Sequence, residues 1–162
     1  MRVGVGVRTV MSGGALTVLV TDDDASCREL YRHWLGDRHE VREAENGERA
    51  LERLDATVDV VLLDREMPGA SGSEVARRIA TGDASPHVVM VSSAPVDVDL
   101  EELPIHDYVR KPVDAADLEA VLGEYRARQA YETALSELFS ITSTVAAMEA
   151  DVSVPTGNEA DA

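Results

Sequence analysis

The sequence predicts a doubly wound α/β fold, with a five-stranded parallel sheet covered by helices on both faces and a C-terminal α-helical extension. Short apolar runs alternate with segments of helical spacing from Thr17 onward, which is typical of a parallel sheet with crossover helices. Three of the runs are too apolar for a half-exposed sheet, so both of their faces are expected to be buried. The 162 residues suffice for one such domain, placed at residues 16–128, with further structure beside it.

Five runs are expected to form the strands, in the order 17–20, 39–41, 59–63, 87–91 and 108–109. Apolar residues at helical spacing lie between them and predict three helices. These residues are Leu30, Trp34 and Leu35, then Ala50, Leu51 and Leu54, then Val75, Ile79 and Ala80. The segment before the last strand differs, because Pro95 and Pro104 bound it. Proline at either end limits a helix there to about two turns, so a short or irregular turn is predicted.

A helix is expected after Pro112, with Asp114 and Asp117 close to a capping-box arrangement at its start. Its first turns bury four apolar residues, Leu118, Val121, Leu122 and Tyr125. No helix breaker follows until Pro155, so the helix is expected to continue through 126–149.

Apolar residues in this continuation recur at steps of three and four, as in a heptad seam. They are Tyr131, Ala134, Leu138, Ile141, Val145 and Met148, widened by Leu135 and Phe139. Such a face should not stay in water. It can pack on its own domain, on a partner helix, or on a second copy as a homodimer, and the sequence leaves these three open.

The charge balance excludes two classes of partner. Asp and Glu total 31 against 15 Lys and Arg, the net charge is −16, and Lys111 is the only lysine. Sequence-independent nucleic-acid binding and docking on an anionic membrane both require cations. The acidic surface either serves solubility or indicates a protein from a halophilic archaeon. In concentrated salt, the repulsion between surface carboxylates is screened beyond about 3 Å.

The compartment is expected to be cytoplasmic. Cys27 is the only cysteine, so no intramolecular disulfide forms. No apolar run is long enough to span a bilayer, and residues 1–15 contain no signal-peptide core, so they are expected to form a flexible tail. Residues 152–162 are expected to be a disordered acidic tail.

Acidic side chains, a hydroxyl and the only lysine follow the strands of the predicted sheet. Asp22 and Asp23 follow the first strand, Asp64 the third, Ser92 the fourth and Lys111 the fifth. Because the carboxyl ends of parallel strands meet at one edge, these side chains should converge there. Two carboxylates 4 Å apart repel by about 4 kcal/mol at an effective dielectric constant near 20, so the cluster requires a cation. Oxygen ligands favour Mg²⁺ over zinc, and a carboxylate beside Mg²⁺ and lysine can accept a phosphoryl group.

Each part of this set also has an ordinary structural explanation. Asp22–Asp24 can be a helix cap followed by acids, Asp64 a turn residue and Lys111 an exposed loop cation. The complete order of acid pair, Asp, Ser and Lys-Pro on successive strand ends favours the site.

Residues 17–125 resemble a response-regulator receiver domain, the CheY-like module of two-component signalling. The matching stretches are 18–24 (VLVTDDD), 61–69 (VLLDREMPG) with Gly72, 90–93 (MVSS) and 107–113 (DYVRKPV). The resemblance implies that a sensor histidine kinase phosphorylates Asp64. It also implies that Mg²⁺ is held by Asp22, Asp23, Asp64 and the backbone carbonyl of Glu66.

The same resemblance assigns roles to three further residues. Ser92 is the switch hydroxyl, Lys111 pairs with the phosphate, and Tyr108 is the aromatic residue that swings inward on activation. The Lys111–Pro112 bond is usually cis in the family. The fourth-helix segment departs from the family pattern, which puts the usual output face in doubt.

Residues 131–150 resemble the first half of a HalX region, which is found behind receivers in haloarchaea. We assign this extension to residues 129–151. A further acidic helical stretch usually follows in that family, whereas this sequence continues with Val154-Pro155 and an acidic tail, so the HalX region is expected to be truncated.

These observations predict a response regulator that signals through protein contacts with an unknown output protein. It is not expected to be an enzyme or to bind nucleic acid or membrane. Two alternatives stay open: a Mg²⁺-dependent phosphohydrolase with an aspartyl-phosphate intermediate, and a non-phosphorylated scaffold. The hydrolase requires a second acid as general acid shortly after the nucleophile, and residues 65–68 offer no Asp there.

Overall fold

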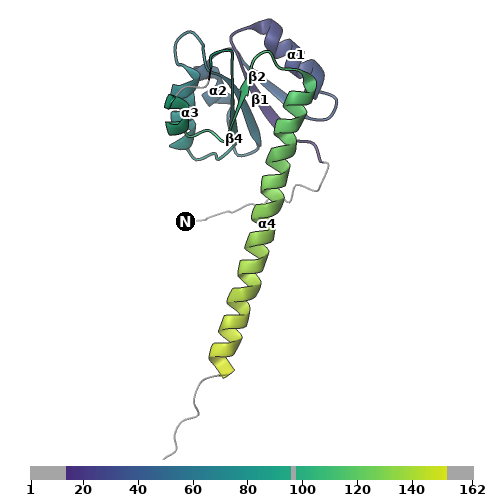
Figure 1. The fold of residues 1–162 in the computed structure, drawn as a ribbon, viewed down its shortest axis with the longest axis vertical. Helices are drawn as coiled ribbons and strands as arrows, with labels where there is room; N and C mark the ends of the chain where they lie inside the picture. Colours follow the sequence, from purple (N-terminus) through teal and green to yellow (C-terminus); the bar gives the residue numbers. More distant parts are fainter. Residues whose placement is uncertain (1–13, 96–97, 153–162) are drawn as a thin grey trace, which may run out of the picture. The chain divides into compact units, whose positions relative to one another are not determined.

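The computed structural model describes residues 14–95 and 98–152, and their sheet has five parallel strands (Figure 1). The strands are β1 (Thr17–Thr21), β2 (Glu40–Ala44), β3 (Val60–Asp64), β4 (His87–Ser92) and β5 (Asp107–Arg110). They lie in the order β2-β1-β3-β4-β5, and every neighbouring pair is parallel. The doubly wound α/β fold is confirmed.

Helices cover both faces of the sheet. They are α1 (Ala25–Leu35), α2 (Gly47–Arg53), α3 (Gly72–Ala80), the 3-10 helix η1 (Val98–Glu102) and α4 (Ala115–Val152). Side chains of α2, α3 and η1 pack on one face, and those of α1 and the first turns of α4 pack on the other. Strand residues alternate between the faces, so Leu63 packs with α2 and α3 while Leu62 packs with α1 and α4. Each such side chain contributes roughly 1.5–3 kcal/mol on burial.

The helices begin where the sequence provides capping side chains. Asp24, Asn46 and Ser71 accept backbone N–H groups at the starts of α1, α2 and α3. At α4, the Asp114 N–H donates to Asp117 Oδ2 at 2.9 Å and the Asp117 N–H donates to Asp114 Oδ1 at 2.8 Å. This reciprocal pair is the capping box predicted from the sequence.

The second strand extends further than predicted. It begins at Glu40 and ends at Ala44, where the apolar pattern had indicated 39–41. β2 is an edge strand that pairs only with β1, over the register from Thr17↔Glu40 to Thr21↔Ala44. An edge strand tolerates polar residues such as Arg42, because part of its surface stays in contact with water.

Two of the apolar residues whose spacing predicts the helices lie on the outside. Leu30 is 44% exposed, and the neighbouring Tyr31 is buried in its place. Ala80 is exposed, whereas Ala76 is buried. One residue along a helix corresponds to a rotation of about 100°, so the sheet selects the buried stripe among adjacent apolar positions.

The connection between β4 and β5 contains the short 3-10 helix η1 where a longer helix would fit an ordinary βαβ unit. Leu100 and Leu103 anchor it in the cluster shared with α2 and α3. The predicted short turn between Pro95 and Pro104 is therefore confirmed.

The chain divides into two compact units, Met1–Tyr125 and Arg126–Ala162, and α4 contributes to both. The four apolar residues predicted at the start of α4 are buried in the first unit. The predicted tails fall almost wholly on residues 1–13 and 153–162, which lie outside the described residues. Within the described chain, no helix has the length and apolar character required to cross a bilayer.

Candidate functional site

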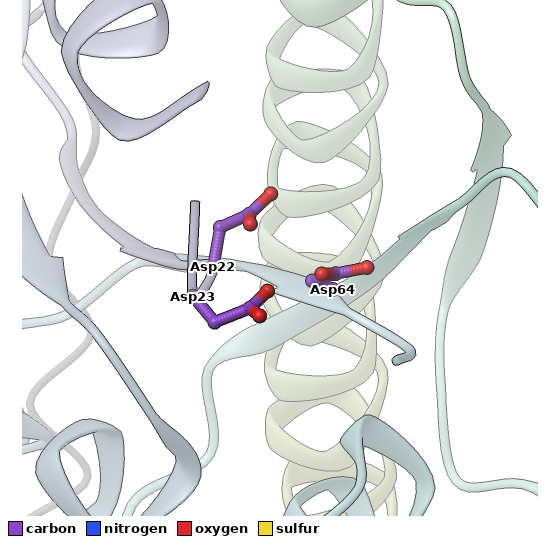
Figure 2. Close-up of side chains that lie close together, drawn as sticks. All are labelled: Asp22, Asp23 and Asp64. Atoms are coloured by element: carbon purple, nitrogen blue, oxygen red, sulfur yellow. The ribbon is translucent and has the colours of Figure 1, made fainter. Parts of the chain in front are cut away.

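Three carboxylates meet at the carboxyl edge of the sheet, as the sequence predicts. Asp22 and Asp23 follow β1, and Asp64 is the last residue of β3 (Figure 2). One carboxylate oxygen from each lies within 4.8 Å of the others. Asp22 and Asp64 are buried, at 2% and 8% exposure, whereas Asp23 is exposed. The cluster is therefore open to solvent on the side of Asp23.

The backbone around Asp22 holds its carboxylate in place. The Asp22 N–H donates to the Ala44 carbonyl at 3.1 Å, which continues the pairing of β1 with β2. Asp22 Oδ1 accepts the Asp24 N–H at 2.9 Å, and Asp24 itself caps α1. The acids at 22–24 therefore have two different roles. Asp24 is the helix cap, and Asp22 and Asp23 belong to the carboxylate cluster.

Lys111 provides the cation beside these acids. Its Nζ lies 3.0 Å from Asp22 Oδ2 and 3.7 Å from Asp64 Oδ1. The Lys111 N–H donates to the Ser92 carbonyl at 2.8 Å, and the Lys111–Pro112 peptide bond is cis. Burial alone would lower the pKa of the Lys111 ammonium, but the hydrogen bond to Asp22 raises it above its ordinary value. Lys111 is therefore charged at any physiological pH.

Burial raises the pKa of Asp64 to about 6, and the negative charge of Asp22 acts in the same direction. The charge of Lys111 and the Glu66 N–H, 3.4 Å from Asp64 Oδ1, oppose the shift. Asp64 is therefore ionised at neutral pH, but its negative charge is destabilised in the folded chain.

This shift predicts that Asp64→Asn stabilises the metal-free protein at neutral pH. The folded-state pKa lies above the ordinary value of 3.8, so the native state binds the proton more tightly and loses stability as the pH rises from about 4 to about 6. The free energy of unfolding of Asp64→Asn should exceed that of the unchanged chain by about 2 kcal/mol at pH 7. The difference should shrink towards pH 4.

Urea denaturation with EDTA at pH 4, 5, 6 and 7 measures this difference. Glu74→Gln is a suitable control, because Glu74 is an exposed acid at the start of α3. A difference that does not depend on pH would contradict the prediction.

The donor set fits a hard divalent cation. Carboxylate oxygens with an open side suit Mg²⁺, which binds one or two carboxylates and keeps several waters. No histidine or cysteine belongs to the cluster among the described residues. Asp22, Asp23 and Asp64 could therefore hold the ion. That the backbone carbonyl of Glu66 is a further ligand stays a prediction.

Ser92 and Tyr108 are linked through the backbone of Ala94. Ser92 is buried at the end of β4, and its Oγ accepts the Ala94 N–H at 3.1 Å. The Tyr108 hydroxyl, on β5, donates to the Ala94 carbonyl. The Tyr108 side chain is partly buried and packs against the cluster with α2, α3 and η1. A change at Ser92 can therefore reach Tyr108 through one residue.

Gly72 allows α3 to begin against the backbone of Asp64. A Cβ at this position would lie 2.3 Å from the Asp64 carbonyl oxygen and 2.7 Å from Arg65 Cα. The Gly72 N–H also donates to the Arg65 carbonyl at 2.9 Å. The close approach fixes the loop that follows Asp64, so only glycine fits there.

Gly72→Ala should therefore lower the free energy of unfolding by about 2–3 kcal/mol, because the clash involves backbone atoms that cannot rotate away. Gly123→Ala is the matched control. A Cβ at Gly123 meets nothing within 4 Å, so alanine should stabilise α4 by about 0.5–1 kcal/mol. Thermal denaturation of both variants checks the opposite signs, and equal effects would contradict the explanation.

One positioning residue was not predicted. Arg28, on the first turn of α1, donates from Nη1 to the Asp22 carbonyl at 2.7 Å, and its Nε lies 3.6 Å from Glu43 Oε1 on β2. It ties the loop of the cluster to α1 and to the edge strand. The sequence carries no signal for it, because an arginine six positions after Asp22 has no motif of its own.

Comparison with known proteins gives consistent matches. A family model described as the response regulator receiver domain matches residues 18–123. A Haloferax volcanii protein with a provisional name as a transcriptional regulator is 40% identical over 133 residues, which is 82% of this chain. The chain spans only 23% of that relative's length.

Two further matches cover almost the whole of the other protein. A two-component response regulator of Oryza sativa subsp. japonica is 34% identical over 125 residues, which cover 72% of this chain and 98% of the rice protein. The crystal structure of a CheY-like receiver domain from Methanospirillum hungatei matches with a TM-score of 0.67 and 20% identity, over 74% of this chain and 99% of that one. At that identity the structural match shows the fold alone.

Proposed function

The chain belongs to the response regulator receiver domain family, and on this premise we propose that it accepts a phosphoryl group on Asp64 from a sensor histidine kinase. The observation that carries the proposal is the meeting of Asp22, Asp23 and Asp64 with Lys111 at one edge of the sheet. Homology to the response regulators of two-component systems supports it.

The proposed reaction is a transfer between two side chains. A carboxylate oxygen of Asp64 forms a bond to phosphorus, while the bond from phosphorus to the kinase's histidine nitrogen breaks and its electron pair stays on that nitrogen. Lys111 stabilises the charge on the phosphoryl oxygens, and the Ser92 hydroxyl donates a hydrogen bond to one of them. Mg²⁺ held by Asp22, Asp23, Asp64 and the Glu66 carbonyl would neutralise charge on the same group.

The phosphorylated state would act through Ser92 and Tyr108. When the Ser92 hydroxyl turns to a phosphoryl oxygen, the geometry at Ala94 changes, and the Tyr108 hydroxyl loses or shifts its acceptor. Tyr108 would then swing inward and alter the surface near β5. We propose that this surface addresses an output protein, without nucleic acid or membrane as a direct partner, and that the chain turns over no external substrate.

The experiment is incubation of the purified chain with acetyl phosphate and Mg²⁺, followed by intact-protein mass spectrometry. A single added phosphoryl group, labile to alkali and hydroxylamine as an acyl phosphate is, supports the proposal. Multiple-turnover hydrolysis of a phosphomonoester would favour the Mg²⁺-dependent phosphohydrolase instead. A chain that takes up no phosphoryl group would favour the static scaffold.

We further propose that the protein works in the salt-rich cytoplasm of a halophilic archaeon. A net charge of −16 with a single lysine and the Haloferax relative support this. The HalX character of residues 129–151 stays a prediction.

Salt should therefore stabilise the fold. We expect the free energy of unfolding to rise steadily between 0.1 M and about 2 M KCl, because screening removes the repulsion among surface carboxylates. Equal concentrations of KCl and NaCl should have similar effects. Thermal denaturation measures the rise, and a melting temperature that does not depend on salt would contradict the halophilic origin.

A further inference from the structure

The second unit of the chain exposes a broad apolar face on α4. Seven large apolar side chains are exposed there, Tyr131, Leu135, Leu138, Phe139, Ile141, Val145 and Met148. Phe139 is the most exposed of them, at 77%. Most helical stability in proteins comes from the packing of an apolar face, and an exposed apolar face of this extent marks an interaction site.

The spacing of the face indicates a helix as its partner. Tyr131, Leu138 and Val145 are seven residues apart, and Ala134, Ile141 and Met148 form the complementary seven-residue series. Two helices with such series interlock their side chains along a seam. No charged side chain lies in this seam between residues 131 and 148.

We propose that the seam binds a second copy of this chain, in antiparallel orientation. An antiparallel pair brings residue 131 opposite 148, residue 134 opposite 145 and residue 138 opposite 141. The small Ala134 then meets the larger Val145. In a parallel pair the two copies of Ala134 would face each other and leave the seam underfilled.

Charge and polarity along the edges of the seam favour the same orientation. One edge carries Leu135, Phe139 and Thr142, and the other carries Glu137 and Thr144. In the antiparallel pair, each edge packs against the same edge of the other copy. The two copies of Phe139 therefore come together near the two-fold axis.

The same register places Arg128 of each copy opposite Glu149 of the other, so the dimer gains two ion pairs. In a parallel pair, the edge with Leu135 and Phe139 would instead face the edge with Glu137 of the other copy. Arg128 would then lie opposite Gly123. A two-fold dimer with matched edges is self-complementary in the way that such interfaces require.

A second copy fits better than the other partners. Arg128, at the start of the seam, is the last lysine or arginine of the described chain, and one cation is too few for nucleic acid or an anionic membrane. The carboxylates Glu132 and Glu137 lie outside the seam, so a second copy brings no like charges into it. The proposal does not depend on the chemistry of Asp64.

The mass of the full chain in 2 M KCl tests the proposal, by size-exclusion chromatography with light scattering. We expect about 35 kDa, twice the 17.5 kDa of one chain. Leu138→Glu should raise the dimer dissociation constant at least about 100-fold, because each dimer loses two buried leucines. Ser140→Glu, on the opposite face of the same turn, should leave it unchanged.

A monomeric unchanged chain would overturn the proposal, as would a dimer that tolerates Leu138→Glu. An unchanged far-ultraviolet circular dichroism spectrum and thermal unfolding of the first unit show that the Leu138→Glu variant remains folded.

Disulfide trapping tests the orientation, with Cys27→Ser as the background. A134C and V145C should cross-link only when the two variants are mixed, because residue 134 faces residue 145 of the other copy. Cross-linking of A134C with itself would indicate a parallel pair and overturn the antiparallel assignment.

Discussion

Asp64→Ala should abolish covalent labelling of the chain by acetyl phosphate in the presence of Mg²⁺. Asp64 is buried to 8% exposure beside Lys111 and Asp22, with its pKa raised to about 6. A carboxylate that is ionised at neutral pH yet more basic than usual is a better nucleophile than an exposed surface acid. Asp22 is also buried beside Lys111, but both of its carboxylate oxygens already accept hydrogen bonds, from the Asp24 N–H and from Lys111, so labelling should fall to background without Asp64.

Mass spectrometry of the intact protein after incubation measures the labelled fraction. Asp24→Asn is the matched control, because Asp24 lies two residues from Asp22 and caps α1, a role that asparagine keeps. It should label as the unchanged chain does. A labelled Asp64→Ala variant would mean that another residue accepts the phosphoryl group.

Asp23→Asn should weaken Mg²⁺ binding about 100-fold. The three carboxylates lie within 4.8 Å of one another, and a unit charge beside a divalent ion contributes several kcal/mol even at an effective dielectric constant near 20. Much of this is offset by the exposure of Asp23, so a loss of about 2.7 kcal/mol, or 100-fold, is expected. Isothermal titration calorimetry of the unphosphorylated protein measures it.

Lys111→Met should change the Mg²⁺ affinity in the opposite direction. The ammonium lies 3.0 Å from Asp22 and 3.7 Å from Asp64, so it neutralises the same charges that the ion would neutralise. Its removal should tighten Mg²⁺ binding about 10-fold while it slows phosphoryl transfer. A Lys111→Met variant that binds Mg²⁺ more weakly would show that Lys111 supports the metal site and does not compete with it.

Much of the fold was predictable because the central strands have a strong pattern. β1, β3 and β4 are buried along their whole length, so their apolar runs have no other explanation. The edge strand β2 was predicted too short, because its polar residues lack that signal. That Tyr31 is buried and Leu30 is exposed depends on the rotation of α1 about its axis relative to the sheet. The sequence alone does not determine this rotation.

The site was predictable as far as topology determines it. The order of acids, serine and lysine on successive strand ends requires them to meet at one edge. Their pairing was not predictable. Lys111 lies closer to Asp22 than to Asp64, and Tyr108 is tied to Ser92 through Ala94. These contacts depend on loop geometry at the scale of single hydrogen bonds.

The short connection η1 has a consequence for local stability. Two leucines, Leu100 and Leu103, anchor η1 in the core, and its 3-10 hydrogen bonds are weaker than those of an α-helix. The free energy for opening this segment should therefore be far below that of β1 or β3, and its amides should exchange with deuterium first. We therefore expect η1 to open while the central strands of the sheet stay folded.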